Sequence, residues 1–302
     1  MTNAAQRIVD GDLRALARAA TWIENRSPEA EPLLRELFPY TGRALILGVT
    51  GPPGAGKSTL CDQCARLIRA DGKTVGILAV DPSSPFSGGA VLGDRIRMQQ
   101  HHADPGVFIR SMATRGWLGG LARATTEMTM LLDAAGRDVV LVETVGVGQD
   151  EVEIARLAHV TLVVLTPGAG DDVQTLKAGI MEIAQVFVIN KSDLPGAEKL
   201  RREIHAAMGL AHSLEHDPEV EIVNTVALEG KGVADVLAAA RRAEPRGRDP
   251  ERSAEIWAAR LREMLRDRLL DRFSADDFIA AGREVAAHQR DPYSILHDWL
   301  KR

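Results

Sequence analysis

The 302-residue chain contains little of what secreted and membrane proteins depend on. Its only cysteines, Cys61 and Cys64, cannot form a disulfide framework. No apolar run approaches the roughly 18 residues that a membrane span needs. The first twenty residues also lack the apolar stretch of a signal peptide. We therefore expect a cytoplasmic protein with no membrane segment.

The chain also has no excess of basic residues. Lys and Arg number 37 against 42 Asp and Glu, which gives a net charge of -5. This balance argues against a protein that binds nucleic acid or anionic lipid. Hydrophobic residues make up 45% and charged residues 26%, so disordered and collagen-like chains are excluded. Aromatic residues make up only 4%, whereas the 27 glycines point to functional loops built from backbone.

Seven short apolar runs alternate with helical patterns between residues 43 and 242. Continuous runs of Val, Ile and Leu are typical of strands that helices cover on both faces. We therefore predict an α/β fold with a mostly parallel, doubly wound sheet. The seven runs are ALILGVT, TVGILAV, GVFIRS, DVVLVET, VTLVVLT, AQVFVIN and VEIVNTV.

Helical spacing continues on both sides of this region. Residues 4–25 predict one amphipathic helix, and Pro28 opens a shorter helix that ends at Leu37. Residues 243–253 have no periodicity and predict a linker, after which the helical spacing returns and Ser274 is a candidate helix cap. The expected parts are an N-terminal helical extension (1–42), the sheet domain (43–242) and a C-terminal helical segment (243–302).

A phosphate-binding loop follows the first predicted strand and fits G-x-x-x-x-G-K-[ST]. Its glycines let backbone N–H groups surround a phosphate, and the following helix directs its positive end at the same anion. We expect Lys57 to reach the β and γ phosphates and Ser58 to bind Mg²⁺. The loop thus predicts a P-loop NTPase fold. Its residues are Gly51, Pro52, Pro53, Gly54, Ala55, Gly56, Lys57, Ser58 and Thr59.

A second motif indicates which nucleotide binds. Asn190, Lys191 and Asp193 fit N-K-x-D, the pattern of GTP-binding proteins. A carboxylate at Asp193 can accept from N1–H and the 2-amino group of guanine, whereas adenine presents an acceptor at N1 and no amino group at C2. GTP and GDP are therefore the expected ligands. GTPases commonly place S-A-x in a further loop whose backbone N–H meets guanine O6; the corresponding residues here are Val226, Ala227 and Leu228.

Glu143 and Gly146 occupy the positions of the D-x-x-G motif that binds metal and γ-phosphate. Glutamate in place of aspartate is a departure from that pattern. Ras-like enzymes place a water-orienting glutamine directly after this glycine, but here Val147 holds that position and the nearest amide is Gln149. We therefore expect slow hydrolysis of GTP unless a partner completes the site.

Two more carboxylates are candidate ligands of Mg²⁺ or of its water. Asp81 follows the second predicted strand, and Asp94 follows a glycine-rich loop. A helix N-cap is an equally good interpretation of Asp94. Lys57, Asp94, Glu143 and Gly146 are the candidate catalytic residues, and Ser58, Asp81, Asp94 and Glu143 are the candidate metal ligands.

Four longer segments resemble one family closely: DPSSPFSGGAVLGDRIRM, RSMATRGWLGGLA, ETVGVGQDE and TPGAGDDVQTLKAGIMEIA. They are similar to the MeaB/ArgK family of P-loop GTPases, the group related to human methylmalonic aciduria type A protein. The likeness covers most of residues 5–300, with two minor departures at Gln185 and Ser192. It implies a homodimer with helical extensions, the C-terminal one acting as a dimerisation arm.

The same resemblance implies a function. It suggests a GTPase chaperone of an adenosylcobalamin-dependent acyl-CoA mutase, chiefly methylmalonyl-CoA mutase, that gates cofactor loading and protects the mutase. It also implies a family-specific switch over 168–179, in which Gln174 and Lys177 signal the nucleotide state to that partner.

Two other functions compete with this interpretation. A nickel-inserting metallochaperone GTPase would need metal ligands, and the candidates are Cys61, Cys64 and the pair His101 and His102. Neither set is closed, and the cysteines fit the buried face of a helix better. An ATP-using kinase is disfavoured by Asp193.

Overall fold

The computed structural model describes residues 1–81, 101, 103–113, 120–144, 156–168, 183–211 and 220–301. The chain divides into two compact units, Met1–Asp249 and Pro250–Arg302. No helix of the described part is both long and apolar enough to cross a bilayer.

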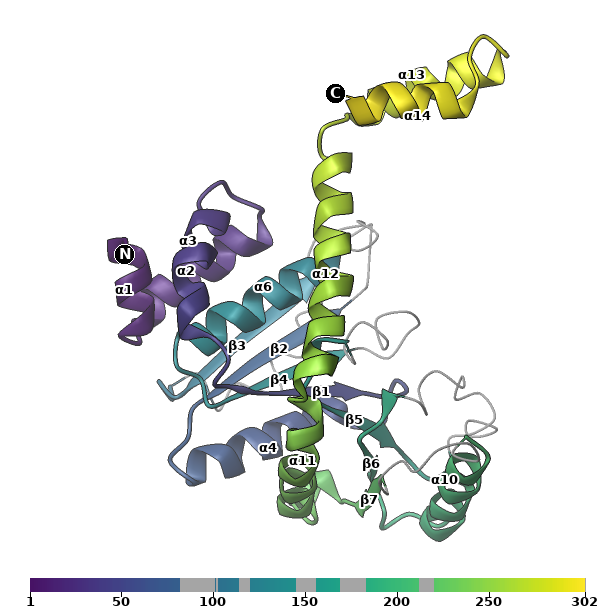
Figure 1. Cartoon of the computed structure of the whole chain (residues 1–302). Helices are drawn as coiled ribbons and strands as arrows, with labels where there is room; N and C mark the ends of the chain where they lie inside the picture. Colours follow the sequence, from purple (N-terminus) through teal and green to yellow (C-terminus); the bar gives the residue numbers. More distant parts are fainter. Residues whose placement is uncertain are drawn as a thin grey trace. The chain divides into compact units, whose positions relative to one another are not determined.

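The first unit is built on one seven-stranded sheet of order β3-β2-β4-β1-β5-β6-β7, in which all neighbouring strands pair in parallel (Figure 1). All seven predicted strands are present, and the doubly wound fold is confirmed. Because the strands are parallel, their carboxyl ends and the loops that follow them share one edge. The strands are β1 (Leu45–Thr50), β2 (Val75–Asp81), β3 (Val107–Ala113), β4 (Val139–Thr144), β5 (Val160–Leu165), β6 (Val186–Ile189) and β7 (Glu221–Asn224).

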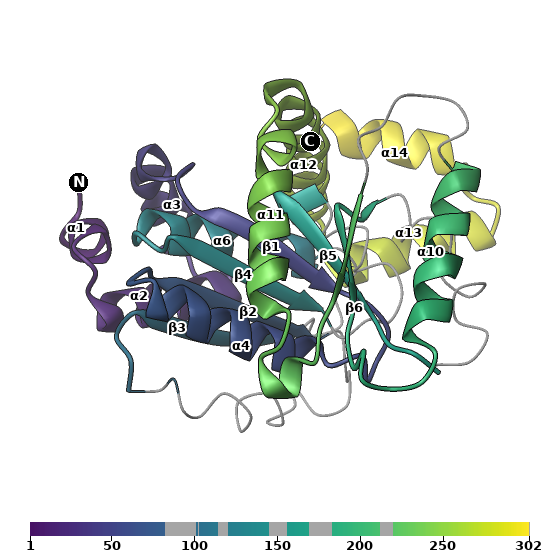
Figure 2. The same cartoon turned by 90° about the horizontal axis from the view of Figure 1, so that it is seen from below.

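Helices cover both faces of the sheet, so alternate residues of a strand enter different cores. In β4, Val139 and Leu141 pack in the core beneath α4 (Lys57–Ala70) and α11 (Val233–Gly247). Val140 and Val142 pack in the opposite core. That second face carries α1 (Asn3–Val9), α2 (Leu13–Glu24), α3 (Ala30–Leu37) and α6 (Gly120–Ala134), while α10 (Ala197–Ala211) packs on β5 and β6. Figure 2 shows α11 and α4 running along the sheet from below.

The single helix predicted over residues 4–25 is two helices. Asp12 ends the first pattern because its carboxylate accepts from the backbone N–H groups of Arg14 and Ala15 and so caps α2. The helix is interrupted at residues 10–12, and α1 and α2 pack in the same core. The second predicted helix is α3, followed by the short 3-10 turn Phe38–Tyr40.

The linker predicted over residues 243–253 contains the boundary between the two units, but its expected lack of helix is wrong for most of its length. α11 continues to Gly247, and α12 begins at Pro250. Ala243 is buried against the sheet, and Pro245 removes only one backbone donor in the last turn. Packing therefore overrides the local signal of proline and charge.

The second unit contains α12 (Pro250–Leu270), α13 (Ala275–Ala286) and α14 (Pro292–Lys301). The predicted cap at Ser274 is confirmed, because it forms a reciprocal capping box with Asp277. Trp299 stacks on Phe273 at 4.5 Å between ring centroids and meets Phe278 edge-on at 4.9 Å. This aromatic cluster joins α14 to α13.

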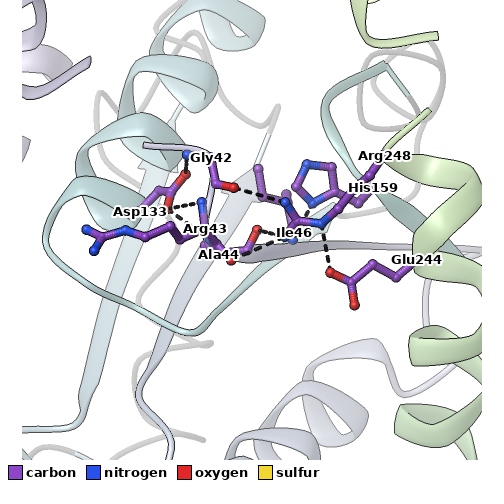
Figure 3. A network of polar contacts seen from close by, with 8 residues as sticks. All are labelled: Gly42, Arg43, Ala44, Ile46, Asp133, His159, Glu244 and Arg248. Atoms are coloured by element: carbon purple, nitrogen blue, oxygen red, sulfur yellow. Dashed lines mark hydrogen bonds and ion pairs between the residues drawn. The ribbon is translucent and has the colours of Figure 1, made fainter. Parts of the chain in front are cut away.

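A polar clamp holds the segment Gly42–Ala44, where the N-terminal helices lead into β1 (Figure 3). The carboxylate of Asp133, 5% exposed at the end of α6, accepts from the backbone N–H groups of Gly42, Arg43 and Ala44 at 2.5–3.1 Å. The guanidinium of Arg248 donates to the carbonyl oxygens of the same three residues at 2.8–3.2 Å. Glu244 in turn accepts from Arg248 at 2.7 Å. Two side chains therefore satisfy the backbone of a segment that belongs to no helix or strand.

Replacing Asp133 by alanine should destabilise the first unit. Three backbone N–H groups would lose one buried acceptor, so we expect the free energy of unfolding to fall by about 2–4 kcal/mol. Urea titration followed by circular dichroism measures this change. Asp235→Ala, at an exposed position of α11, is the matched control and should change the value by about 0.5 kcal/mol or less. Equal effects of the two substitutions would contradict the clamp.

Candidate functional site

The phosphate-binding loop leaves the carboxyl end of β1 in the middle of the sheet and enters α4, as the sequence predicted. The Lys57 side chain is buried and curls back over the loop. Its ammonium donates to the carbonyl oxygens of Gly51 at 2.7 Å and Pro52 at 3.0 Å. The loop thus encloses a cation beside the N-terminus of a helix, which is an arrangement that suits a phosphate.

Gly56 is required where it stands. Its φ is +88°, and a Cβ there would lie 2.4 Å from Nδ2 of Asn190. Both conditions exclude other side chains. The phosphate-binding loop therefore packs directly on the N-K-x-D turn, although Gly56 and Asn190 are 134 positions apart in the sequence.

Asn190 joins three loops through its buried amide. Nδ2 donates to the carbonyl oxygen of Ala55 at 2.8 Å. Oδ1 accepts from Thr225 Oγ1 at 3.1 Å and from the backbone N–H of Ala227 at 3.0 Å. One side chain therefore fixes the phosphate-binding loop, the N-K-x-D turn and the Val226–Leu228 loop relative to one another.

The rest of the N-K-x-D turn lies at the surface. Lys191 has a φ of +54°, and its ammonium donates to the carbonyl oxygen of Gly54 at 3.0 Å. Ser192 N–H donates to the Thr225 carbonyl at 3.0 Å. The carboxylate of Asp193 is exposed beside them. The turn thus presents an acidic side chain to solvent next to the phosphate-binding loop.

Hard oxygen donors meet behind the loop. Ser58 Oγ donates to Glu143 Oε1 at 2.6 Å, and both residues are buried. Thr144 Oγ1 donates to Thr50 Oγ1 at 3.1 Å, which holds the ends of β4 and β1 together. A hydroxyl and a carboxylate at this spacing fit the oxygen ligands that Mg²⁺ prefers.

The two cysteines of α4 are both buried. Burial raises the pKa of Cys64 to about 12 and that of Cys61 well above its usual value, so both stay protonated within the core under α4. His101 is buried, and its Nε2 lies 2.9 Å from Asp62 Oδ1. His102 lies outside the described residues. Within the part of the chain that the structure describes, no three His, Cys, Asp or Glu side chains group to hold a metal.

Several predicted residues cannot be placed. Asp94, Gly146, Gln149, Gln174 and Lys177 all lie outside the described residues, as does most of 168–179. Asp81 is the last residue of β2, and therefore lies at the same sheet edge as the phosphate-binding loop.

Sequence reasoning missed two residues of this site. Thr225 is buried and donates to Asn190, and its only signal was its place before Val226. Lys231 pairs with Val226 across a tight hairpin, and nothing in the motifs singled it out.

Gly56→Ala should impair binding of a nucleoside triphosphate. The new methyl group would collide with the Asn190 amide and force a left-handed backbone on alanine, so we expect affinity to fall by about tenfold or more. Displacement of a fluorescent nucleotide measures the effect.

The matched control is Gly282→Ala in α13, where an added Cβ has no neighbour within 4 Å. It should leave affinity unchanged and slightly stabilise its helix. Unaltered binding by Gly56→Ala would show that the loop does not need this packing.

Comparisons with known proteins show which family the chain is similar to. The family model described as methylmalonyl Co-A mutase-associated GTPase MeaB matches residues 16–277. A Pyrococcus abyssi protein named as a GTPase is 53% identical over 76% of this chain and 72% of its own length. The mouse (Mus musculus) methylmalonic aciduria type A homolog, a mitochondrial protein, is 34% identical over 76% of this chain and 59% of its own.

A solved structure extends the similarity to the whole fold. The crystal structure of a LAO/AO transport system kinase superposes with a TM-score of 0.72 at 30% identity, covering 99% of this chain and 95% of that one. The matched residues 16–277 of the family model include the phosphate-binding loop, Glu143 and the N-K-x-D turn, and the resemblance drawn from the motifs is confirmed. The chain belongs to the MeaB family of P-loop GTPases.

Proposed function

We propose that the protein is a GTP-binding and GTP-hydrolysing chaperone of an adenosylcobalamin-dependent acyl-CoA mutase, with methylmalonyl-CoA mutase as the first candidate. The Asn190 contact carries the nucleotide part of this proposal, because it holds a phosphate-binding loop and an exposed acidic turn in one site. The name of the matched family supports the mutase part. In this role the nucleotide state gates cofactor loading and protects the mutase.

Different residues would contact the phosphates and the base of the nucleotide. Residues Gly51–Thr59 surround the phosphates, and Lys57 exchanges its carbonyl partners for phosphate oxygens. Asp193 accepts from N1–H and the 2-amino group of guanine. The loop Val226–Leu228 borders the base.

A magnesium ion would be held by Ser58 and Glu143, with Asp81 and Asp94 as the further candidate ligands. When bound, it would neutralise charge on the phosphate oxygens. The Ser58–Glu143 hydrogen bond keeps the two oxygen donors side by side and buried. Gly146 remains a proposed γ-phosphate contact.

The purified protein should bind GDP and GTP with Mg²⁺ and should exclude ATP. We expect unaided turnover on the order of 10⁻⁴ s⁻¹ or lower, because a Ras-type glutamine does not directly follow Gly146. Competition against labelled GDP and a phosphate-release assay measure both properties. ATP competing as well as GTP would refute the nucleotide assignment.

Asp193→Asn should change the preferred base. The new amide N–H can donate to the C2 carbonyl of xanthine, so the preference should move from GDP to XDP.

The C-terminal unit supports a second proposed contact, with another copy of this chain. Ile295 is the only buried apolar residue among those described in 250–301. One side of α12 exposes Trp257, Leu261, Met264 and Leu265 at helical spacing. A unit with so small a core gains stability by covering this stripe. We therefore assign α12–α14 to a homodimerisation arm.

Buried thiols argue against the competing nickel function. Cys61 and Cys64 lie inside the apolar core, and no three His, Cys, Asp or Glu side chains among the described residues group to hold a metal ion.

Adding an adenosylcobalamin-dependent acyl-CoA mutase should raise GTP turnover by about tenfold or more, as partners that complete GTPase sites do. Size-exclusion chromatography should show the complex. The control is Lys57→Ala, in which the mutase should not produce GTP turnover. If neither a complex nor a change in rate appears with any such mutase, the chaperone role is wrong and a GTPase of another role remains.

A further inference from the structure

We propose that Thr144 is a positioning residue for the magnesium ligands, because its hydrogen bond to Thr50 holds the end of β4 where Glu143 meets Ser58. This inference rests on the proposed function, in which Ser58 and Glu143 hold Mg²⁺ beside the phosphates. It gives a role to two buried hydroxyl groups that the motifs leave unassigned. Thr144 is an x position of D-x-x-G, and Thr50 precedes the phosphate-binding loop.

The two threonines lie side by side at the ends of neighbouring strands. β1 and β4 pair in parallel, with Val49 in register with Glu143. The next residues along the two strands are Thr50 and Thr144, whose hydroxyl groups lie 3.1 Å apart. Thr50 is 0% exposed and Thr144 is 1% exposed. Water therefore does not compete for this hydrogen bond, and removing either hydroxyl leaves a buried polar group without it.

The last two residues of β4 bond to opposite ends of the phosphate-binding loop. Successive side chains of a strand point to opposite faces of the sheet. Glu143 points to the face covered by α4 and accepts from Ser58 at 2.6 Å, near the end of the loop. Thr144 points to the other face and donates to Thr50, directly before the loop. Movement of the end of β4 would thus disturb both bonds together.

Thr50 is a fixed point to which β4 can be attached. It lies in register with Val163 of β5, on the side of β1 away from β4. The next residue, Gly51, has a φ of +137°, and a Cβ there would lie 2.1 Å from the carbonyl oxygen of Val164. The start of the phosphate-binding loop is therefore packed tightly on β5.

The hydroxyl bond extends the pairing of β4 with β1. The register between the two strands ends at Glu143, and the contact of Thr144 with Thr50 continues it by one residue. Mg²⁺ demands near-ideal octahedral geometry, so a small displacement of a ligand lowers its affinity. A bond directly after Glu143 is therefore well placed to hold the carboxylate beside Ser58.

Thr144→Val keeps the shape of the side chain and removes its hydroxyl. We expect the Mg²⁺ affinity of the GDP complex to fall about three- to tenfold, less than the roughly 10- to 100-fold lost when a group bonded directly to a ligand is removed. GDP affinity in EDTA should stay within about twofold. Titration of Mg²⁺ against the release rate of a fluorescent GDP analogue measures the first value, and equilibrium binding of that analogue in EDTA measures the second.

Related variants separate positioning from general damage. Thr144→Ser keeps the hydroxyl and should keep the Mg²⁺ affinity. Thr50→Val should weaken Mg²⁺ as Thr144→Val does, and the double variant should be no weaker than either one, since all three lose the same bond. The matched control is Thr161→Val in β5. Thr161 is 0% exposed, and its hydroxyl has no hydrogen-bond partner among the described residues. Melting temperatures establish that each variant folds.

The outcomes separate this inference from the proposed function. If Mg²⁺ does not strengthen GDP binding to the unaltered protein, the proposed magnesium site is wrong and the inference falls with it. If Mg²⁺ does so and Thr144→Val keeps the full Mg²⁺ affinity, or loses GDP affinity equally in EDTA and in Mg²⁺, Thr144 has no positioning role. Full Mg²⁺ affinity in Thr50→Val, or an equal loss in Thr161→Val, would also overturn the inference.

Discussion

The hydrogen bonds of the Asn190 side chain are the contact on which the nucleotide site depends. A phosphate-binding loop after β1 and an acidic turn after β6 come from strands that are not neighbours, because β5 lies between them. The amide bridges this gap with a donor aimed at Ala55 and an acceptor shared by Thr225 and Ala227. Neither a hydrophobic side chain nor a carboxylate supplies both functions. The phosphate-binding loop and the N-K-x-D turn thus share one buried group.

Sequence reasoning identified the strands because a parallel sheet covered on both faces leaves an unambiguous apolar pattern. It also identified the phosphate-binding loop, since positive φ values and close packing restrict Gly56 to glycine. The apolar pattern of a strand is local in the sequence, and the demand for glycine falls on a single position. Both can therefore be read from the residues themselves.

The errors came from a local helix cap and from packing between distant residues. Asp12 ended a continuous helical pattern by capping the next helix, and burial of Ala243 carried α11 through a stretch rich in proline and charge. Lys231 escaped notice because its pairing with Val226 exists only when the hairpin is folded. Hydrophobic periodicity reports which face of a helix or strand is buried, and it does not report contacts between a side chain and a backbone segment many residues away.

The clamp around Gly42–Ala44 also constrains the order in which the chain folds. Arg248 lies 204 residues from Ala44, whose carbonyl it binds, and Asp133 lies 89 residues from the same residue. Contacts of such separation form late, because a long loop must close first. On the ribosome, the entry into β1 waits for nearly the whole first unit to emerge. The clamp can therefore close only after Arg248, one residue before the end of the first unit at Asp249, has been synthesised.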